Sequence, residues 1–132
     1  MKLYAPSTIE AIKEKHRFQL SKSLGQNFIT DKHVIERIVE GADPSEKDLV
    51  IEIGPGIGVL TAEAAQQAAK VIAIEIDSKL IPILGETLAE YDNVEVINQD
   101  ILKTDLNGII DEQRQLGNFT GDVKIIGNLP YY

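Results

Sequence analysis

The sequence predicts an α/β protein with a partial parallel sheet and flanking helices. Four short apolar runs rich in β-branched residues alternate with stretches of helical pattern, which is the rhythm of strands joined by right-handed crossovers. A glycine-rich turn follows the first run, and a polar side chain stands at or just after the end of each run. In an open α/β sheet, ligands bind at the edge where the strands end.

Length and composition narrow the classes of protein that fit. The chain has 132 residues, of which 43% are hydrophobic, enough for one domain with a core. It contains no cysteine, which excludes a disulfide framework and a thiolate metal site. No apolar run approaches the roughly 18 residues of a membrane span, and the first residues lack the apolar block of a signal peptide. We therefore expect a cytoplasmic protein with no membrane partner.

The charge is unevenly distributed along the chain. The formal net charge is −8, which by itself argues against a nucleic-acid partner. Residues 1–40 hold seven basic and five acidic side chains, whereas residues 41–132 hold six and sixteen. The small N-terminal excess of positive charge fits either a phosphate-facing segment or a solvated helix face.

The first part of the chain is predicted to form two helices and a loop. A serine–threonine pair can cap a helix over 7–16. The polar, glycine-containing stretch 21–29 is predicted to be a loop. A second helix is expected over 31–42, capped by Asp31. Its expected buried face consists of Val34, Ile35, Ile38 and Val39.

The remaining elements follow from apolar runs and breakers. After the first strand, an alanine-rich helix is expected from about Leu60 to Ala69, and a further helix begins at Ser78 with Pro82 in its first turn. A helix is also expected over 106–116. The predicted strands cover residues 49–53, 71–76, 93–98 and 123–126.

A glycine loop, residues 54–58, joins the first strand to its helix. Its glycines come at alternate positions after Glu52, so the backbone can turn sharply and a ligand can approach it closely. The dinucleotide fingerprint is Gly-x-Gly-x-x-Gly, and here the third glycine comes one residue early. A carboxylate beside the loop suits a cationic ligand better than a pyrophosphate. The pattern resembles the loop of S-adenosylmethionine (SAM) methyltransferases; the alternative is a turn that only joins strand to helix.

Together the motifs resemble those of the ribosomal RNA adenine N6,N6-dimethyltransferases, most closely the bacterial small-subunit branch. The resemblance covers residues 20–132 and implies a Rossmann-like SAM methyltransferase fold. It is carried by Ser23-Leu24-Gly25-Gln26-Asn27-Phe28, Glu52-Ile53-Gly54-Pro55-Gly56-Ile57-Gly58, Glu75, Gln99-Asp100 and Asn128-Leu129-Pro130-Tyr131.

The resemblance implies which residues bind the cofactor SAM, and it implies no metal. The loop with Gln26 and Asn27 would close over SAM, with Ile29 where the family often has leucine. Glu75 would accept hydrogen bonds from the ribose hydroxyls, and Asp100 would accept one from the adenine amino group. The other implied cofactor contacts are Glu52, Gly54, Gly56, Gly58, Ile76, Ile101 and Asn128.

The catalytic residues implied by the resemblance are Asn128, Leu129, Pro130 and Tyr131. The lone pair of adenine N6 is delocalised into the ring, so N6 is a poor nucleophile. The Asn128 side-chain oxygen and a backbone carbonyl, that of Leu129, would accept both N6–H bonds and direct the lone pair at the SAM methyl group. Pro130 would stiffen the turn, and Tyr131 would stack on the target base. The alternative is a proline turn whose tyrosines cover a core edge.

The implied function is dimethylation of adenosine N6 in small-subunit ribosomal RNA. The alternatives are a large-subunit rRNA dimethyltransferase of the antibiotic-resistance type, a non-catalytic nucleic-acid-binding module with the same fold, and a nucleotide-dependent oxidoreductase. The early third glycine disfavours the last of these.

Family members continue well beyond the Asn128 motif. We therefore expect residues 1–30 to form an N-terminal helix and the cofactor-closing loop. Residues 31–132 would form the N-terminal part of the SAM-binding domain, without its remaining strands and a C-terminal helical domain. Such a piece would be inactive alone, and its exposed sheet edge would favour dimerisation.

Overall fold

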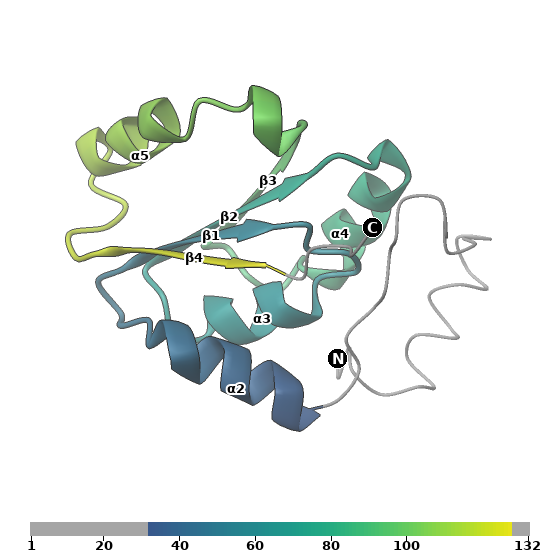
Figure 1. The fold of residues 1–132 in the computed structure, drawn as a ribbon, viewed down its shortest axis with the longest axis horizontal. Helices are drawn as coiled ribbons and strands as arrows, with labels where there is room; N and C mark the ends of the chain where they lie inside the picture. Colours follow the sequence, from purple (N-terminus) through teal and green to yellow (C-terminus); the bar gives the residue numbers. More distant parts are fainter. Residues whose placement is uncertain (1–31, 128–132) are drawn as a thin grey trace.

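The computed structural model describes residues 32–127, which form one parallel sheet between two layers of helix (Figure 1). The strands are β1 (Leu49–Ile53), β2 (Lys70–Glu75), β3 (Val94–Asn98) and β4 (Val123–Gly127). Their order is β3-β2-β1-β4, and every pair is parallel. The predicted parallel α/β architecture is therefore confirmed. The helix expected over 7–16 and the loop expected over 21–29 lie outside the described residues.

The two central strands are buried on both faces. Four of the five residues of β1 are apolar, the exception being Glu52, and all except Ile53 are buried. In β2 all residues except Lys70 are buried. This explains why both segments are continuous apolar runs rather than alternating ones. The outer strands β3 and β4 are largely half-exposed, because each has one neighbour in the described sheet.

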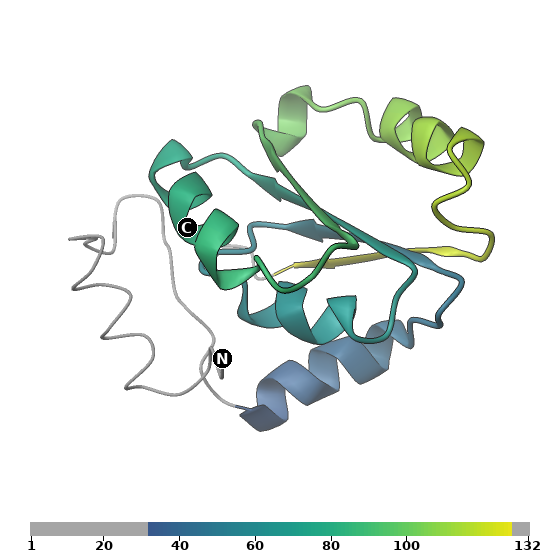
Figure 2. The ribbon, with the colours of Figure 1, turned by 180° about the vertical axis from the view of Figure 1, so that it is seen from behind.

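Helices cover both faces of the sheet. α2 (Lys32–Ala42), α3 (Val59–Ala65) and α4 (Ile81–Thr87) lie on one face, and α5 (Leu106–Gln115) lies on the other (Figures 1 and 2). Short 3-10 turns, η2 (Ser78–Leu80) and η3 (Ile101–Lys103), follow β2 and β3. None of the helices within residues 32–127 is long and apolar enough to cross a membrane.

Alternate residues of each central strand face opposite helical layers. Val50 and Val71 belong to the core under α3, whereas Leu49, Ile51 and Ile72 pack with Phe119 and the apolar face of α5. Side chains alternate between the two faces along a strand, so Glu52 lies on the same face as Val50, and Glu75 lies on the same face as Val71. Both carboxyl groups therefore lie on the sheet face covered by α2, α3 and α4.

Two expectations about the helices are wrong in detail. α3 ends at Ala65 rather than Ala69, and the Asn93 side-chain amide donates to the carbonyls of Ala65 (2.9 Å) and Ala68 (3.2 Å). These bonds satisfy carbonyls at and beyond the end of the helix, so the chain can turn into β2. In α2, Ile35 and Val39 are buried as expected, but Val34 is 42% exposed. It lies about 100° around the helix from Ile35, at the margin of the apolar stripe.

Asp48 joins the loops at the end of the sheet where the strands begin. Its carboxylate accepts hydrogen bonds from the backbone N–H of Ser45 (2.8 Å) and of Asp122 (2.8 Å). These bonds, first that from Ser45, lower the pKa of Asp48 below its usual 3.8. The segments that lead into β1 and β4 are thereby held side by side.

Replacing Asp48 with asparagine is expected to destabilise the protein at neutral pH. The lowered pKa means that the Asp48 carboxylate contributes stability above pH 3.8, which is lost as the pH falls through its lower native pKa. The urea midpoints of parent and variant should therefore converge as the pH falls below 3.8. Asp92→Asn, at an exposed turn, is the control. A difference that stays constant down to pH 2 would contradict this role.

Candidate functional site

The glycine loop adopts backbone conformations that favour glycine at three positions. The φ angles are 73° at Gly54, 61° at Gly56 and 95° at Gly58. A side chain makes this left-handed region costly, whereas glycine enters it freely. The sharp turn predicted from the glycine spacing is confirmed, and it lies at the carboxyl end of β1, the central strand next to β2.

Hydrogen bonds tie the glycine loop to the end of β2. The N–H of Gly54 donates to the carbonyl of Ile74 (2.9 Å), and the N–H of Gly56 donates to Oε1 of Glu75 (3.1 Å). Within the loop, the N–H of Gly58 donates to the carbonyl of Pro55 (2.9 Å). The loop and Glu75 therefore form one hydrogen-bonded unit.

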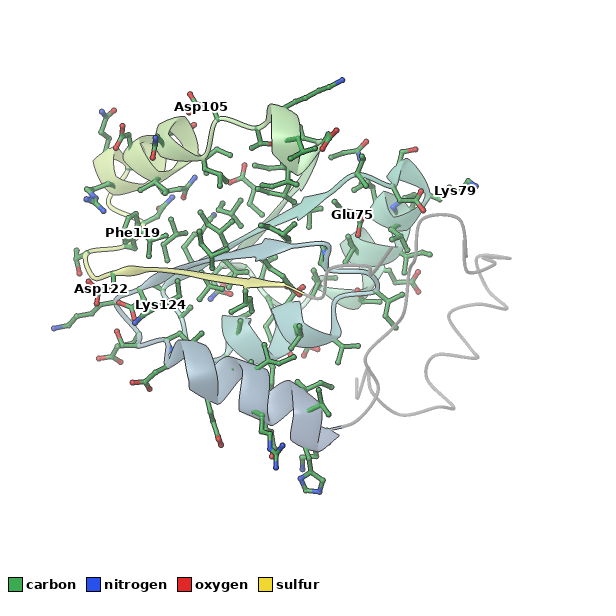
Figure 3. The ribbon with its side chains drawn as sticks, in the orientation of Figure 1. Glu75, Lys79, Asp105, Phe119, Asp122 and Lys124 are labelled. Atoms are coloured by element: carbon green, nitrogen blue, oxygen red, sulfur yellow. The ribbon has the colours of Figure 1, made fainter. Side chains whose placement is uncertain are left out.

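Glu75 lies at the opposite end of the sheet from Asp122 and Lys124 (Figure 3). Its other carboxylate oxygen accepts from the N–H of Asp77 (3.1 Å). Burial raises the pKa of Glu75, and the hydrogen bonds from the Asp77 and Gly56 amides oppose that rise. Its side chain is 4% exposed, so the carboxyl group is held in place and largely removed from water.

Glu52 lies behind the glycine loop and not at its surface. The residue is 1% exposed, and its carboxyl group accepts a hydrogen bond from the hydroxyl of Thr61, in the first turn of α3. Burial raises the pKa of Glu52 to about 7, the Thr61 hydrogen bond opposes the rise, and the charge of Glu75 adds to it. Two acids with raised pKa values therefore lie beside the loop, and the charge of Glu75 acts on Glu52. Perturbed acids of this kind mark functional-site candidates.

The end of β3 completes this edge of the sheet. The Asn98 side-chain amide donates to the carbonyls of Glu75 (2.8 Å) and Ile76 (3.3 Å). Ile76 is 57% exposed, immediately after Glu75. Asp100 caps η3 by accepting from the N–H of Leu102 (3.0 Å), and Ile101 packs half-buried against the α5-side core.

The structure thus gathers six of the predicted residues, with their neighbours, along the ends of β1 and β2: Glu52, Gly54, Gly56, Gly58, Glu75 and Ile76. Asp100 and Ile101 follow the adjacent strand β3. The other predicted site residues lie outside the described residues: Gln26, Asn27, Ile29, Asn128, Leu129, Pro130 and Tyr131. Gly127, which precedes Asn128 in the sequence, pairs with Ile53 beside the glycine loop.

Sequence reasoning missed the side chains that hold this edge together. Thr61 bonds Glu52, Thr87 donates to the carbonyl of Ile57, and Asn98 bonds the end of β2. The sequence did hint at a role for Thr61, because this residue follows the glycine loop by one helical turn. It gave no hint for Asn98 or Thr87, since their partners lie 22 to 30 residues away along the chain.

Comparison with known proteins identifies the family. The model of the ribosomal RNA adenine dimethylase family matches residues 17–132. This chain belongs to that family. The ribosomal RNA small subunit methyltransferase A of Alkaliphilus metalliredigens is 58% identical over 132 residues, which is 99% of this chain and 44% of the relative. The chain therefore spans less than half the length of this curated family member.

Solved structures agree with the family assignment. The crystal structure of the 23S rRNA methyltransferase ErmE is 42% identical, with a TM-score of 0.57, over 60% of this chain and 32% of that one. An RNA methyltransferase from Salinibacter ruber, in complex with S-adenosyl-L-homocysteine, is 26% identical with a TM-score of 0.54. The match covers 67% of this chain and 68% of that one. These likenesses confirm the predicted Rossmann-like methyltransferase fold.

The raised pKa of Glu52 makes stability depend on pH in a defined direction. Between the ordinary pKa of 4.5 and about 7 the native Glu52 keeps a proton that the unfolded chain releases, so the free energy of unfolding falls as pH rises. Glu52→Gln removes this proton linkage and can still accept from Thr61. Between pH 4.5 and 7 the free energy of unfolding is expected to fall less in the variant than in the parent, by a difference of up to roughly 3 kcal/mol.

Urea denaturation across that pH range measures the effect. Glu46→Gln, at an exposed turn, should leave the slope unchanged. Equal pH slopes for the parent and Glu52→Gln between pH 4.5 and 7 would refute the assignment.

Proposed function

We propose that this chain carries the SAM-binding part of an enzyme that dimethylates adenosine N6 in small-subunit ribosomal RNA. The observation that carries the proposal is the bond from the Gly56 N–H to the Glu75 carboxylate. It sets an acid against a glycine loop at the carboxyl end of a parallel sheet, where nucleoside ligands bind in this class of fold.

The chemistry of the loop and its acids fits SAM. The cofactor has no phosphate and carries an ammonium and a sulfonium group, both positive. Glu75 supplies an acidic group at the glycine loop, and Glu52 lies behind that loop. The Salinibacter ruber relative holds S-adenosyl-L-homocysteine, the demethylated product of SAM.

Each described residue has a proposed role toward the cofactor. Glu75 accepts hydrogen bonds from the ribose hydroxyls, and the exposed Ile76 packs on the adenine ring. Asp100 accepts from the adenine amino group, with Ile101 packed beside that ring. Gly54 and its neighbours contact the methionine portion.

The sequence supplies the proposed roles outside residues 32–127. Gln26, Asn27 and Ile29 belong to the segment proposed to close over the cofactor. Asn128 contributes to cofactor binding as well as to catalysis.

Methyl transfer needs the adenine nitrogen to be positioned more than activated. When bound, SAM supplies an electrophilic methyl group. The Asn128 side-chain oxygen and the Leu129 carbonyl accept the two N6–H bonds and turn the nitrogen lone pair toward that methyl group. In this proposal Pro130 would restrict the backbone of the motif, and Tyr131 would stack on the base, an interaction worth about 1–3 kcal/mol.

The small-subunit branch is favoured over the large-subunit branch. The small-subunit relative is 58% identical over 99% of the chain, against 42% over 60% for the 23S enzyme. The Leu24-Gly25-Gln26-Asn27 sequence points the same way. We propose that the protein works in the cytoplasm, where ribosomal subunits are its partners.

The edge strand β4 supports one further proposal, that two copies of this 132-residue chain dimerise through it. β4 pairs only with β1 in the described sheet, and Ile125 is 56% exposed. An unpaired edge with exposed apolar side chains favours pairing with another chain.

Analytical ultracentrifugation tests this proposal. The parent chain should sediment as a dimer, and Ile125→Lys should convert it to a monomer. A monomeric parent would refute the proposal.

Calorimetric titration of the intact protein with SAM tests the cofactor site. We expect the parent to bind and Glu75→Gln, which keeps one acceptor oxygen for the Gly56 N–H and loses the one for the Asp77 N–H, to bind about 10- to 100-fold more weakly. A hydrogen bond to a charged group is worth roughly 1.5–3 kcal/mol. The control is Glu95→Gln, which is exposed in β3. Absence of binding by the parent, or binding indifferent to Glu75, would count against the proposal.

Transfer of labelled methyl groups to purified ribosomal subunits tests the substrate. A protein of the full length of the relatives is expected to produce N6,N6-dimethyladenosine in the small-subunit RNA only. Label confined to the large-subunit RNA would move the protein to the resistance branch. Nucleic-acid binding without methyl transfer would instead favour the non-catalytic module.

A further inference from the structure

The glycine loop is held from a second side by α4. The hydroxyl of Thr87, the last residue of α4, donates to the backbone carbonyl of Ile57 at 2.8 Å. Thr87 is 3% exposed and Ile57 is 2% exposed, so water does not readily replace this bond. A buried carbonyl that loses its donor retains the full cost of its desolvation.

The bond is tertiary, although threonine has a local alternative. A threonine hydroxyl within a helix commonly bonds the carbonyl three or four residues earlier in its own helix. Here it spans 30 residues to the glycine loop. The end of α4 is also very close to the loop, because a Cβ added at Gly58 would lie 3.1 Å from both Thr87 Oγ1 and Leu88 Cδ2.

Thr87 and Glu75 bond to two peptide groups of the loop that are separated by one other peptide group. Glu75 accepts from the N–H of Gly56, whereas Thr87 donates to the carbonyl of Ile57. A carboxylate that must also accept from the ribose hydroxyls shares its lone pairs between loop and ligand. The Thr87 bond has no such competitor, since its hydroxyl is buried behind the loop.

We propose that Thr87 is a positioning residue that keeps the glycine loop in its SAM-binding conformation through the Ile57 carbonyl. The inference rests on the proposed function, because it assigns Thr87 a role in binding that cofactor. Thr87 bonds the loop and is itself buried, so its effect is on the fraction of molecules whose loop is ready to bind.

Calorimetric titration of the intact protein with SAM, alongside thermal unfolding, tests the proposal. Thr87→Val keeps the shape and removes the donor, and it is expected to weaken SAM binding about tenfold, the equivalent of roughly 1.4 kcal/mol. Thr87→Ser keeps the hydroxyl and should bind within about twofold of the parent. Thr87→Cys, a weaker donor, should lie between them.

Asn93→Ala is the matched control for a purely structural effect. Asn93 also donates to backbone carbonyls far along the chain, those of Ala65 and Ala68, but at the end of the sheet away from the glycine loop. This variant should lower the unfolding temperature and leave the SAM Kd unchanged. Equal Kd values for parent and Thr87→Val, or an equal loss in Thr87→Ser and Thr87→Val, would overturn the proposal. If Thr87→Val does not fold, equal Kd values for Thr87→Ser and Thr87→Cys would overturn it.

Amide hydrogen exchange without cofactor separates this inference from the proposed function. Exchange at Gly54, Gly56 and Gly58 should be faster in Thr87→Val than in the parent, and unchanged in Asn93→Ala. A parent that fails to bind SAM would refute the proposed function, and with it the role in cofactor binding, even if the exchange difference remained. A parent that binds SAM but shows no exchange difference would refute the Thr87 inference alone.

Discussion

The hydrogen bond from the Gly56 N–H to the Glu75 carboxylate joins the two parts of the candidate site. It is possible only because β1 and β2 are parallel neighbours in a register that brings their carboxyl ends together. It also needs Gly56 at positive φ, so that the amide is directed toward the next strand. The loop conformation, the sheet register and the position of the acid therefore depend on one another.

Burial of acidic groups beside the loop costs stability. Desolvation raises the pKa of both Glu52 and Glu75, and the charge of Glu75 adds to the rise at Glu52. Folding alone leaves this electrostatic cost partly uncompensated. The proposed cofactor carries positive groups, which would offset this cost on binding. A pyrophosphate would increase the cost.

Much of the fold and of the site could be predicted from local patterns. Apolar runs located the four strands to within one residue at each end, and the three glycines located the turn. The end of α3 was missed, because an alanine-rich stretch has high helix propensity whereas tertiary bonds from Asn93 favour an early stop. The exposure of Val34 was missed because it lies at the margin of its helical stripe.

The sequence by itself determined the α/β class, the glycine loop and the acids at or just after the ends of β1, β2 and β3, because each depends on residues close together in the chain. Tertiary structure alone decided that Glu52 is sealed behind the loop by Thr61 and that Thr87 and Asn98 support the site. Those partners meet only after the strands have paired and the helices have packed. Local sequence carries no record of a contact made by residues distant along the chain.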